Sequence, residues 1–472
     1  MKILLISPRQ TLAERTPSAL QIPQIALQLL AGLTDAKHEV RIVEEEFVDV
    51  DMSLSPDLVG LSLMTANAPR GYALADHFRA RGAKLVLGGI HPSVLPEEAL
   101  EHADSVVVGE AEELWPQVVA DVEAGRPKPI YKADRPADLT KVPFPRRDIG
   151  RVKRWLNVLP VMTTRGCPYS CEFCSVSAVY GRKIRNFPVD WVVHDIKRAG
   201  GKVHLILDDN IIARPAYAEE LFKALKPLKI YWVGQASMSF ALREDLMRLA
   251  YESGCRGLFF GMETVSEESM RRMKKSFRDL NDVADGIRLI QAAGIRFHAS
   301  VVFGFDTDDA TIFQRTVDFL MTCRVHSVSF NILTPYPGTR VYAALEEDGR
   351  LFTRDWRYYN HMTVVFRPAR MTALELAEGH LRARRNFYRG ASILQRAATH
   401  WRHPVFYGGM NLAYRRSAKR ARLPIAPGWE SSVPGWNNGE THCPPAADHT
   451  GIRRPEAEPS SRQRWPVMEH QL

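Results

Sequence analysis

The feature that most constrains the fold is a repeated alternation of short apolar runs with stretches of helical periodicity. In residues 1–125, five such runs occur at 2–7, 39–47, 58–64, 84–89 and 105–110. Each run is nearly continuous, which is typical of strands that are buried on both faces of a parallel sheet covered by helices. Residues 1–125 are therefore expected to form an α/β domain with a doubly wound, five-stranded sheet.

A second series of runs begins near residue 158 and predicts six further strand–helix units. These runs lie at 161–166, 203–209, 230–237, 257–264, 297–305 and 327–338. Six units favour a partial (β/α)6 barrel over residues 158–368, with its working face at the carboxyl ends of the strands. Residues 126–157 contain several prolines and little periodicity, and are expected to link the two domains.

Three of the six cysteines lie within eight positions, directly after the first strand expected in the barrel. Cys167, Cys171 and Cys174 have C-x3-C-x2-C spacing, so one loop can turn three thiolates toward a metal centre. A closed zinc site needs a fourth ligand, and no C-x2-C or H-x3-H pair accompanies the cluster. An iron–sulfur cluster with one open iron fits three ligands better. Zinc and three inert buried cysteines are the alternatives.

This motif, with the aromatic Phe173 before its last cysteine, resembles the radical S-adenosylmethionine (SAM) superfamily over residues 158–368. The resemblance implies a [4Fe–4S] cluster held by Cys167, Cys171 and Cys174, with SAM bound at the open iron. Reductive cleavage of SAM would give a 5′-deoxyadenosyl radical that takes hydrogen from an unactivated C–H bond. A reducing partner such as flavodoxin or ferredoxin is then expected.

The resemblance also implies that residues at the barrel strand ends bind SAM. The family places polar groups near the methionyl amino group after the second strand and near the ribose after the fourth. After the fifth strand, the backbone passes near adenine. The alternative for each polar residue is a loop cap or a solvated turn. The residues concerned are Asp208, Asp209 and Asn210 after the second strand, Gln235 and Ser237 after the third, Glu263 after the fourth and Gly304 after the fifth.

The first domain resembles the flavodoxin-like or Rossmann-like cobalamin-binding domain that precedes many radical SAM barrels. Ser62, Gly88 and Gly89 stand where that fold admits the nucleotide tail of cobalamin, and glycine allows close approach of a ligand. The loop after the first strand, SPRQTLAER, has no D-x-H-x-x-G, so no histidine is expected to ligate cobalt from it. A domain without a cofactor is the alternative. For His91 the sequence leaves two alternatives open: its side chain points toward the corrin, or it caps a turn.

The region 369–430 is expected to be helical and is strongly basic. Residues 382–422 contain eleven basic residues and no acidic one. Such a segment can lie on an anionic membrane, each cation contributing on the order of 1 kcal/mol, and would suit a lipid-like substrate. RNA or a phosphorylated metabolite would meet the same charges, and a solvated helical face packed on the barrel is a further alternative. Residues 431–472 are expected to be disordered.

A corrinoid beside a radical generator suits methylation of an unactivated carbon of a small-molecule or lipid-like substrate. Cyclisation or rearrangement within the same family, and a non-catalytic corrinoid or metal sensor, are the alternatives. RNA methylthiolation is disfavoured because no cysteine precedes Cys167, so nucleic acid is not an expected partner. Since no apolar run approaches the roughly 20 residues of a spanning helix, we expect a cytoplasmic protein with peripheral membrane contact.

Overall fold

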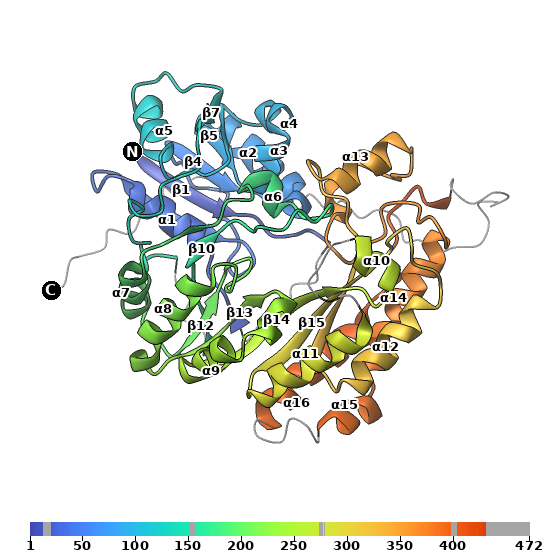
Figure 1. Ribbon diagram of the computed structural model, residues 1–472. Helices are drawn as coiled ribbons and strands as arrows, with labels where there is room; N and C mark the ends of the chain where they lie inside the picture. Colours follow the sequence, from blue (N-terminus) through green and yellow to red (C-terminus); the bar gives the residue numbers. More distant parts are fainter. Residues whose placement is uncertain (13–19, 151–155, 273–276, 278, 398–403, 431–472) are drawn as a thin grey trace.

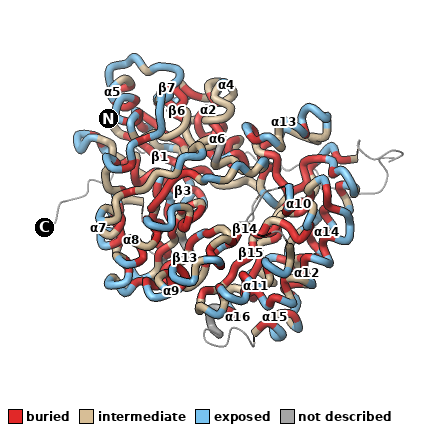
Figure 2. The backbone as a smooth tube through the Cα atoms, in the orientation of Figure 1, coloured by how far each residue is buried: buried red, intermediate tan, exposed pale blue. Residues whose placement is uncertain are grey.

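Two parallel six-stranded sheets organise the chain in the computed structural model, which describes residues 1–12, 20–150, 156–272, 277, 279–397 and 404–430. In Figure 1 the strands of the first sheet, in blue to cyan, lie in the upper part of the view, and those of the second lie below them. In Figure 2 exposed residues lie mainly on the outer loops and helix faces, while buried residues follow the strands. The expected α/β class is confirmed.

The N-terminal sheet has the strand order β3-β1-β4-β5-β6-β7, and all neighbouring pairs are parallel. The doubly wound fold is confirmed, but the predicted number of five strands is wrong. The sixth strand lies inside the segment expected to be a linker, and its three residues are too few to show periodicity. The strands are β1 (Lys2–Ser7), β3 (Glu39–Glu44), β4 (Leu58–Ser62), β5 (Lys84–Gly88), β6 (Ser105–Val108) and β7 (Ile130–Lys132).

Successive residues of β1 show why its apolar run is continuous. Ile3 belongs to the core that includes residues of α1 (Ile25–Leu33) and α5 (Trp115–Glu123). Leu4 belongs to a separate core on the other face, which includes residues of α2 (Ala68–Ala80). Side chains alternate between the two faces of a strand. Because both faces are buried, the residues at odd and at even positions of the run must all be apolar.

The C-terminal sheet has the order β16-β15-β14-β13-β12-β9, again with all neighbours parallel. Its first and last strands are not paired with each other in the described chain, so the barrel is open, which confirms the partial (β/α)6 prediction. The strands are β9 (Leu159–Val161), β12 (Val203–Ile206), β13 (Tyr231–Ala236), β14 (Cys255–Glu263), β15 (Arg296–Phe303) and β16 (Ser327–Ile332). The helices between them include α7 (Val189–Ala199), α8 (Pro215–Leu225), α9 (Glu244–Glu252), α11 (Leu280–Ala292) and α12 (Ile312–Thr322).

Alternation along the barrel strands separates an outer core from the barrel interior. Trp232 of β13 is buried in the main core, whereas its strand neighbours Tyr231 and Gln235 are exposed on the other face. The register aligns Gln235 with Phe259, and Phe259 with His298. These three side chains therefore form one row on the inner face of the sheet.

Three helices follow the barrel and confirm the helical prediction for the C-terminal region: α14 (Ala373–Phe387), α15 (Gly390–Ala397) and α16 (Pro404–Arg420). Tyr388 covers the outer edge of β16, because its hydroxyl accepts a hydrogen bond from the Val328 backbone N–H at 2.9 Å and donates to the Val328 carbonyl at 2.6 Å. This pairing satisfies an edge strand that would otherwise invite association.

No helix in the described ranges is both long enough and apolar enough to span a membrane. The tail expected to be disordered, residues 431–472, lies outside the described residues.

Candidate active site

The three clustered cysteines lie in a loop that leaves the carboxyl end of β9. The short strands β10 (Thr164–Arg165) and β11 (Arg185–Asn186) pair antiparallel and close the base of this loop. Gly166 begins the loop with φ of 87°, and a Cβ there would lie 2.7 Å from the carbonyl oxygen of Lys183. Glycine is therefore required at the first turn. We call residues 166–184 the cluster loop.

Cys167, Cys171 and Cys174 are all partly exposed. Burial, and to a smaller extent the neighbouring Cys171, Asp209 and Cys167, raises the pKa of Cys174 to about 11. Metal binding would displace that proton, because the thiolate is the ligand. Since Cys171 and Cys167 both contribute to the raised pKa of Cys174, the other two thiols lie near Cys174.

No three His, Cys, Asp or Glu side chains in the described residues converge as ligands of one metal ion. In a [4Fe–4S] cluster, however, each cysteine binds a different iron, so the three sulfurs are more widely spaced than ligands of one ion. Three partly exposed thiols on one loop at a strand end therefore fit a cluster with an open iron.

Asp208 holds the start of the cluster loop rather than facing the open site. Its carboxylate accepts hydrogen bonds from the backbone N–H groups of Thr163 at 2.7 Å and Thr164 at 2.9 Å, and from the Thr163 hydroxyl. The side chain is fully buried, and burial raises its pKa. Asp208 thus acts as a positioning residue in this structure, and its expected contact with SAM stays a prediction.

Asp209, the next residue, lies beside the cluster loop. It accepts a hydrogen bond from the Gly166 backbone, while burial and the charge of Asp208 raise its pKa to about 6. Asn210 instead joins two strand ends, since its Oδ1 accepts from the Ser237 backbone N–H at 3.1 Å and its Nδ2 donates to the Ser237 hydroxyl at 3.3 Å. Contact of Asp209 and Asn210 with SAM stays a prediction.

Glu263 ends β14 in a left-handed conformation, with φ of 64°, after a register shift between β14 and β15. Such a conformation costs a residue with a side chain about 1–3 kcal/mol and is concentrated at functional sites. The bulge in the β14–β15 pairing accompanies this conformation, and the expected contact of Glu263 with the ribose of SAM stays a prediction. Gln235 lies on the interior face, in the row described above.

Gly304 has φ of 104° and follows β15. A Cβ at this position would lie 3.1 Å from the side chains of both Leu376 and Phe366. Packing of α14 against this turn thus already explains the glycine, independently of any approach by adenine.

Asp308 was not found from the sequence, although it fixes this same turn. Its Oδ2 accepts hydrogen bonds from the backbone N–H groups of Gly304 at 3.0 Å and Phe305 at 3.1 Å. Its Oδ1 is buried with no hydrogen-bond partner in the described chain, and burial raises the pKa of Asp308 to about 7. The acidic run after the fifth strand, DTDD, was the available signal.

A cavity of about 740 Å³ adjoins the cluster loop. Its walls include Cys171 and Phe173 of that loop, Phe305 after β15, and residues of α13 (Arg340–Glu347). The rings of Phe173 and Phe305 meet edge to face at 5.8 Å. This volume lies within the range of small-molecule sites. The walls are mixed, since Arg182, Arg340 and Arg350 line the cavity together with the aromatic rings.

The carboxyl ends of the N-terminal strands hold the residues expected to admit cobalamin. Ser62 and Gly88 are partners in the β4–β5 register. A Cβ at Gly88 would have no neighbour closer than 3.8 Å, so the chain itself does not require glycine there. Gly89 differs, because its φ is 102° and a Cβ would lie 2.5 Å from the Leu63 carbonyl oxygen. The fold alone therefore requires glycine at position 89. At position 88 the fold does not require glycine, so a nearby ligand could be the reason for it.

Several buried polar atoms at this edge of the sheet have no hydrogen-bond partner in the described residues: Arg9 Nε, Thr11 Oγ1 and Glu44 Oε1. The other oxygen of Glu44 accepts from the Gln24 backbone N–H at 3.0 Å, and burial raises the pKa of Glu44 to about 7. Buried polar atoms without partners at the strand ends fit a large ligand with an amide-rich rim, as cobalamin has.

His91 is fully buried and is engaged within the protein. Its Nε2 lies 3.1 Å from Glu98 Oε1, and Trp356, which follows the barrel, donates from Nε1 to the same oxygen at 2.9 Å. A second contact between the domains lies nearby, where a Cβ on Gly338 would be 2.9 Å from Val94. His91 thus lies at the domain interface, and its Nδ1 is buried with no hydrogen-bond partner in the described residues.

Comparisons with known proteins agree with this division of the chain. Residues 161–320 match the Radical SAM superfamily, and residues 16–119 match the B12 binding domain. The bacteriochlorophyllide d C-12(1)-methyltransferase of Chlorobaculum tepidum is 29% identical over 408 residues, covering 84% of this chain and 89% of that protein. The hopanoid C-2 methylase of Rhodopseudomonas palustris is 24% identical, covering 73% and 68%.

Among solved structures, the radical SAM methyltransferase TsrM from Kitasatospora setae, with cobalamin and a [4Fe–4S] cluster bound, has a TM-score of 0.65 at 16% identity. The alignment covers 89% of this chain and 99% of TsrM. The cobalamin-dependent radical enzyme OxsB has a TM-score of 0.62 at 14% identity, covering 89% and 72%. At these identities the likeness shows the shared fold.

The fold and the cluster loop thus define a radical SAM enzyme. With a B12-binding domain before the barrel, the chain belongs to the cobalamin-binding branch of the radical SAM superfamily. Membership implies three cofactors, namely a [4Fe–4S] cluster, SAM and cobalamin.

Proposed function

We propose that the protein is a cobalamin-dependent methyltransferase that acts on an unactivated carbon of a small-molecule or lipid-like substrate. The observation that carries this proposal is the contact between α3 (Ile90–Val94), which follows the Gly88–Gly89 turn, and α6 (Val176–Val179) in the cluster loop. It brings the expected corrinoid edge and the expected radical site together. The relatives named as methyltransferases support methylation over other outcomes.

In this proposal, the cluster would be held by Cys167, Cys171 and Cys174, and when bound the cofactors supply hydrogen abstraction and a transferable methyl group. Asp208 fixes the start of the loop that carries these cysteines. Glu263 offers a carboxylate from a strained strand end. The edge-to-face pair of Phe173 and Phe305 would shield one wall of the cavity from water.

The acceptor class is proposed from two observations. The relatives described above are named for a bacteriochlorophyllide and for a hopanoid. In this chain, Leu394 of α15 is 75% exposed and Leu412 of α16 is 43% exposed, and exposed cations such as Arg416 and Arg420 lie on the same C-terminal helices. Apolar side chains beside cations suit an anionic lipid surface. We therefore propose peripheral membrane contact through these helices.

Liposome sedimentation tests the membrane contact. The full chain should sediment with anionic vesicles at low salt and not with zwitterionic vesicles, and Leu394→Ser with Arg416→Ser should reduce the bound fraction. Equal recovery in the supernatant with both lipid types would remove this part of the proposal.

The reductant is proposed to be a flavodoxin or a ferredoxin. The outer residues of the cluster loop, Pro168 and Ser170, are exposed, so a protein donor can approach the loop from outside. Reduction of the reconstituted cluster by either carrier, followed by EPR spectroscopy, tests this assignment.

The reaction itself is tested with the full chain, reconstituted anaerobically with iron and sulfide and loaded with hydroxocobalamin. Methyl-labelled SAM, a reductant and candidate apolar acceptors should give labelled product together with 5′-deoxyadenosine and S-adenosylhomocysteine. Cleavage of SAM with an unlabelled, rearranged product would favour cyclisation or rearrangement. Retained cobalamin without any cleavage of SAM would favour a corrinoid sensor.

A further inference from the structure

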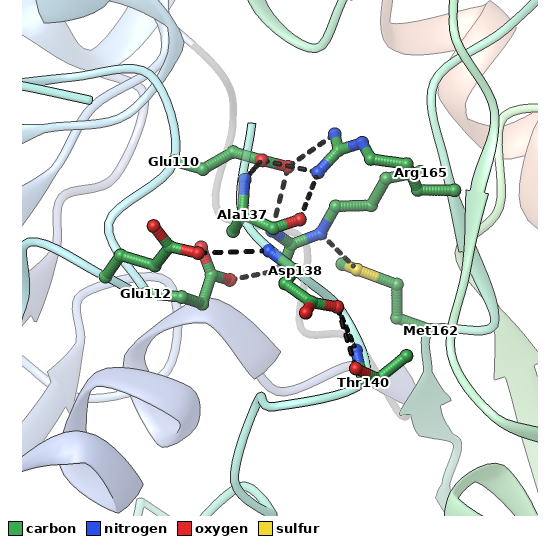
Figure 3. Close-up of polar contacts among 9 residues, drawn as sticks. Glu110, Glu112, Ala137, Asp138, Thr140, Met162 and Arg165 are labelled. Carbon is green, nitrogen blue, oxygen red and sulfur yellow. Dashed lines mark hydrogen bonds and ion pairs between the residues drawn. The ribbon is translucent and has the colours of Figure 1, made fainter. Parts of the chain in front are cut away.

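A buried network of four charged side chains crosses the boundary between the two domains. Arg165 donates from Nη1 to Glu110 Oε1 at 3.0 Å, and its other terminal nitrogen pairs with Glu112. Arg185 donates to both oxygens of Glu110, at 2.6 and 2.8 Å. Figure 3 shows Glu110 and Arg165 facing each other from the two sides of the boundary. All four side chains are at most 14% exposed.

The two sides of this network come from elements with different expected ligands. Glu110 and Glu112 follow β6, at the carboxyl edge of the sheet expected to hold cobalamin. Arg165 and Arg185 form the base of the cluster loop, and Arg165 stands two residues before Cys167. The network is therefore a direct connection between the corrinoid domain and the loop that would hold the cluster.

The arrangement of the two arginines shows what the glutamates do. Arg165 and Arg185 are direct partners in the antiparallel β10–β11 register. Like charges directly opposite each other destabilise a strand pair, and burial strengthens their repulsion. The carboxylate of Glu110 lies between both guanidinium groups, so a residue of the other domain neutralises the pair.

The charge of Glu110 is maintained by the same contacts. Burial alone would raise its pKa, but the hydrogen bond from Arg185 and the charge of Arg165 outweigh burial and lower it. Glu110 also accepts a hydrogen bond from the Ala137 backbone N–H at 2.8 Å, and Arg185 donates to the Ala137 carbonyl at 2.9 Å. The segment between the domains is thus tied to the same group.

We propose that Arg165 and Arg185 are positioning residues, and that Glu110 and Glu112 of the corrinoid domain set the shape of the cluster loop through them. The proposal rests on the proposed function in one respect, namely that the loop holds a [4Fe–4S] cluster that binds SAM. Without Glu110, the repulsion between the arginines opens the base of the loop, and SAM binding at the cluster weakens.

The test uses the full chain with a reconstituted cluster and follows the change that SAM causes in the EPR spectrum of the reduced cluster. Glu110→Gln keeps the size of the side chain and removes its charge. We expect the dissociation constant for SAM to rise at least tenfold, with iron content and cobalamin affinity unchanged. The matched control is Glu98→Gln, a carboxylate at the same domain boundary that contacts His91 and Trp356 and should bind SAM like the wild type.

A second substitution separates repulsion from a simple loss of packing. In the double variant Glu110→Gln/Arg185→Gln one of the two repelling charges is gone, so SAM affinity should recover to within about threefold of the wild type. If the double variant binds SAM no better than Glu110→Gln, or if Glu110→Gln binds SAM as the wild type does, the proposal is overturned. Equal losses in Glu110→Gln and Glu98→Gln would also overturn it, because domain docking in general would then be the cause.

Failure of the proposed function is visible separately. It would appear as a wild-type protein that assembles no cluster or shows no spectral response to SAM. If Glu110→Gln fails to fold, Glu112→Gln, which touches only Arg165 of the pair, should show a smaller loss of SAM affinity. An unchanged affinity in that variant would count against the proposal.

Discussion

The two adjacent glycines after β5 allow a prediction that separates the demands of the fold from those of a ligand. At Gly88 a Cβ would have 3.8 Å of clearance, and Gly88 is not among the residues with positive φ. Gly88→Ala should therefore change the free energy of unfolding by less than about 1 kcal/mol. If the corrinoid passes close to Gly88, the added methyl group should weaken cobalamin binding at least tenfold, which is about 1.4 kcal/mol.

Gly89→Ala is the matched control, with the opposite balance of effects. The φ of 102° and ψ of −172° at Gly89 are accessible almost only to glycine, so an alanine held in this conformation loses about 1–3 kcal/mol of stability. In addition, its Cβ would overlap the Leu63 carbonyl oxygen at 2.5 Å. A total loss of at least about 3 kcal/mol should lower the melting temperature of this domain by roughly 10 °C.

Differential scanning fluorimetry of the apoprotein measures stability, and absorbance of cobalamin retained after gel filtration measures binding. Full retention of cobalamin by Gly88→Ala would refute the reasoning, because no ligand would then require the space at that position. A large loss of stability in Gly88→Ala would contradict the clearance on which the reasoning depends.

Three further predictions concern the barrel and the C-terminal helices. Cys171→Ala should abolish the visible absorption of the reconstituted cluster but leave cobalamin binding intact, since the N-terminal domain has its own cores; loss of both would contradict separate sites. Burial raises the pKa of Asp308 to about 7, above its value in the unfolded chain. The wild type should therefore lose stability relative to Asp308→Asn as the pH rises from about 4 to 7, by up to about 4 kcal/mol. Denaturation at several pH values checks this, and a constant difference would be evidence against it. Arg396 is fully buried and donates to the carbonyls of Val325 and His326, so Arg396→Met should cost about 2–4 kcal/mol of stability without changing vesicle sedimentation; a drop in sedimentation of the folded variant would contradict it.

The strands of the N-terminal sheet could be predicted from the sequence because both faces of that sheet are covered, which makes its strands continuously apolar. The barrel strands could be predicted from the repeated alternation of apolar runs with helical stretches. The strand β7 was not predicted, because it has only three residues and pairs only with β6 among the described residues. The cysteine cluster could be predicted for a different reason, since its spacing is local and one loop carries all three ligands.

The roles of the strand-end residues were harder to predict, because a position after a strand does not say which way the side chain turns. Asp208 and Asp209 are adjacent, yet the first is fully buried under the threonines before the loop and the second lies beside the cysteines. Because adjacent side chains of an extended chain point to opposite sides, these two aspartates point in different directions. Only the fold shows which of the two sides faces the site. The Arg165–Glu110 contact joins residues 55 positions apart, so it depends on how two domains dock.

In the basic C-terminal region, the sequence likewise does not show which cations are exposed. A count of eleven cations overstates the charge that a membrane would meet, because Arg396 is buried among carbonyls. Arg384 bonds to the Ser417 hydroxyl, and Arg385 to the carbonyls of Ala418 and Ala421, so both hold α14 against the end of α16. Since each surface cation contributes on the order of 1 kcal/mol, the proposed membrane contact would depend on the fewer exposed cations together with apolar side chains such as Leu394. Binding should therefore be weak, reversible and sensitive to salt, which is compatible with an enzyme that visits a lipid surface.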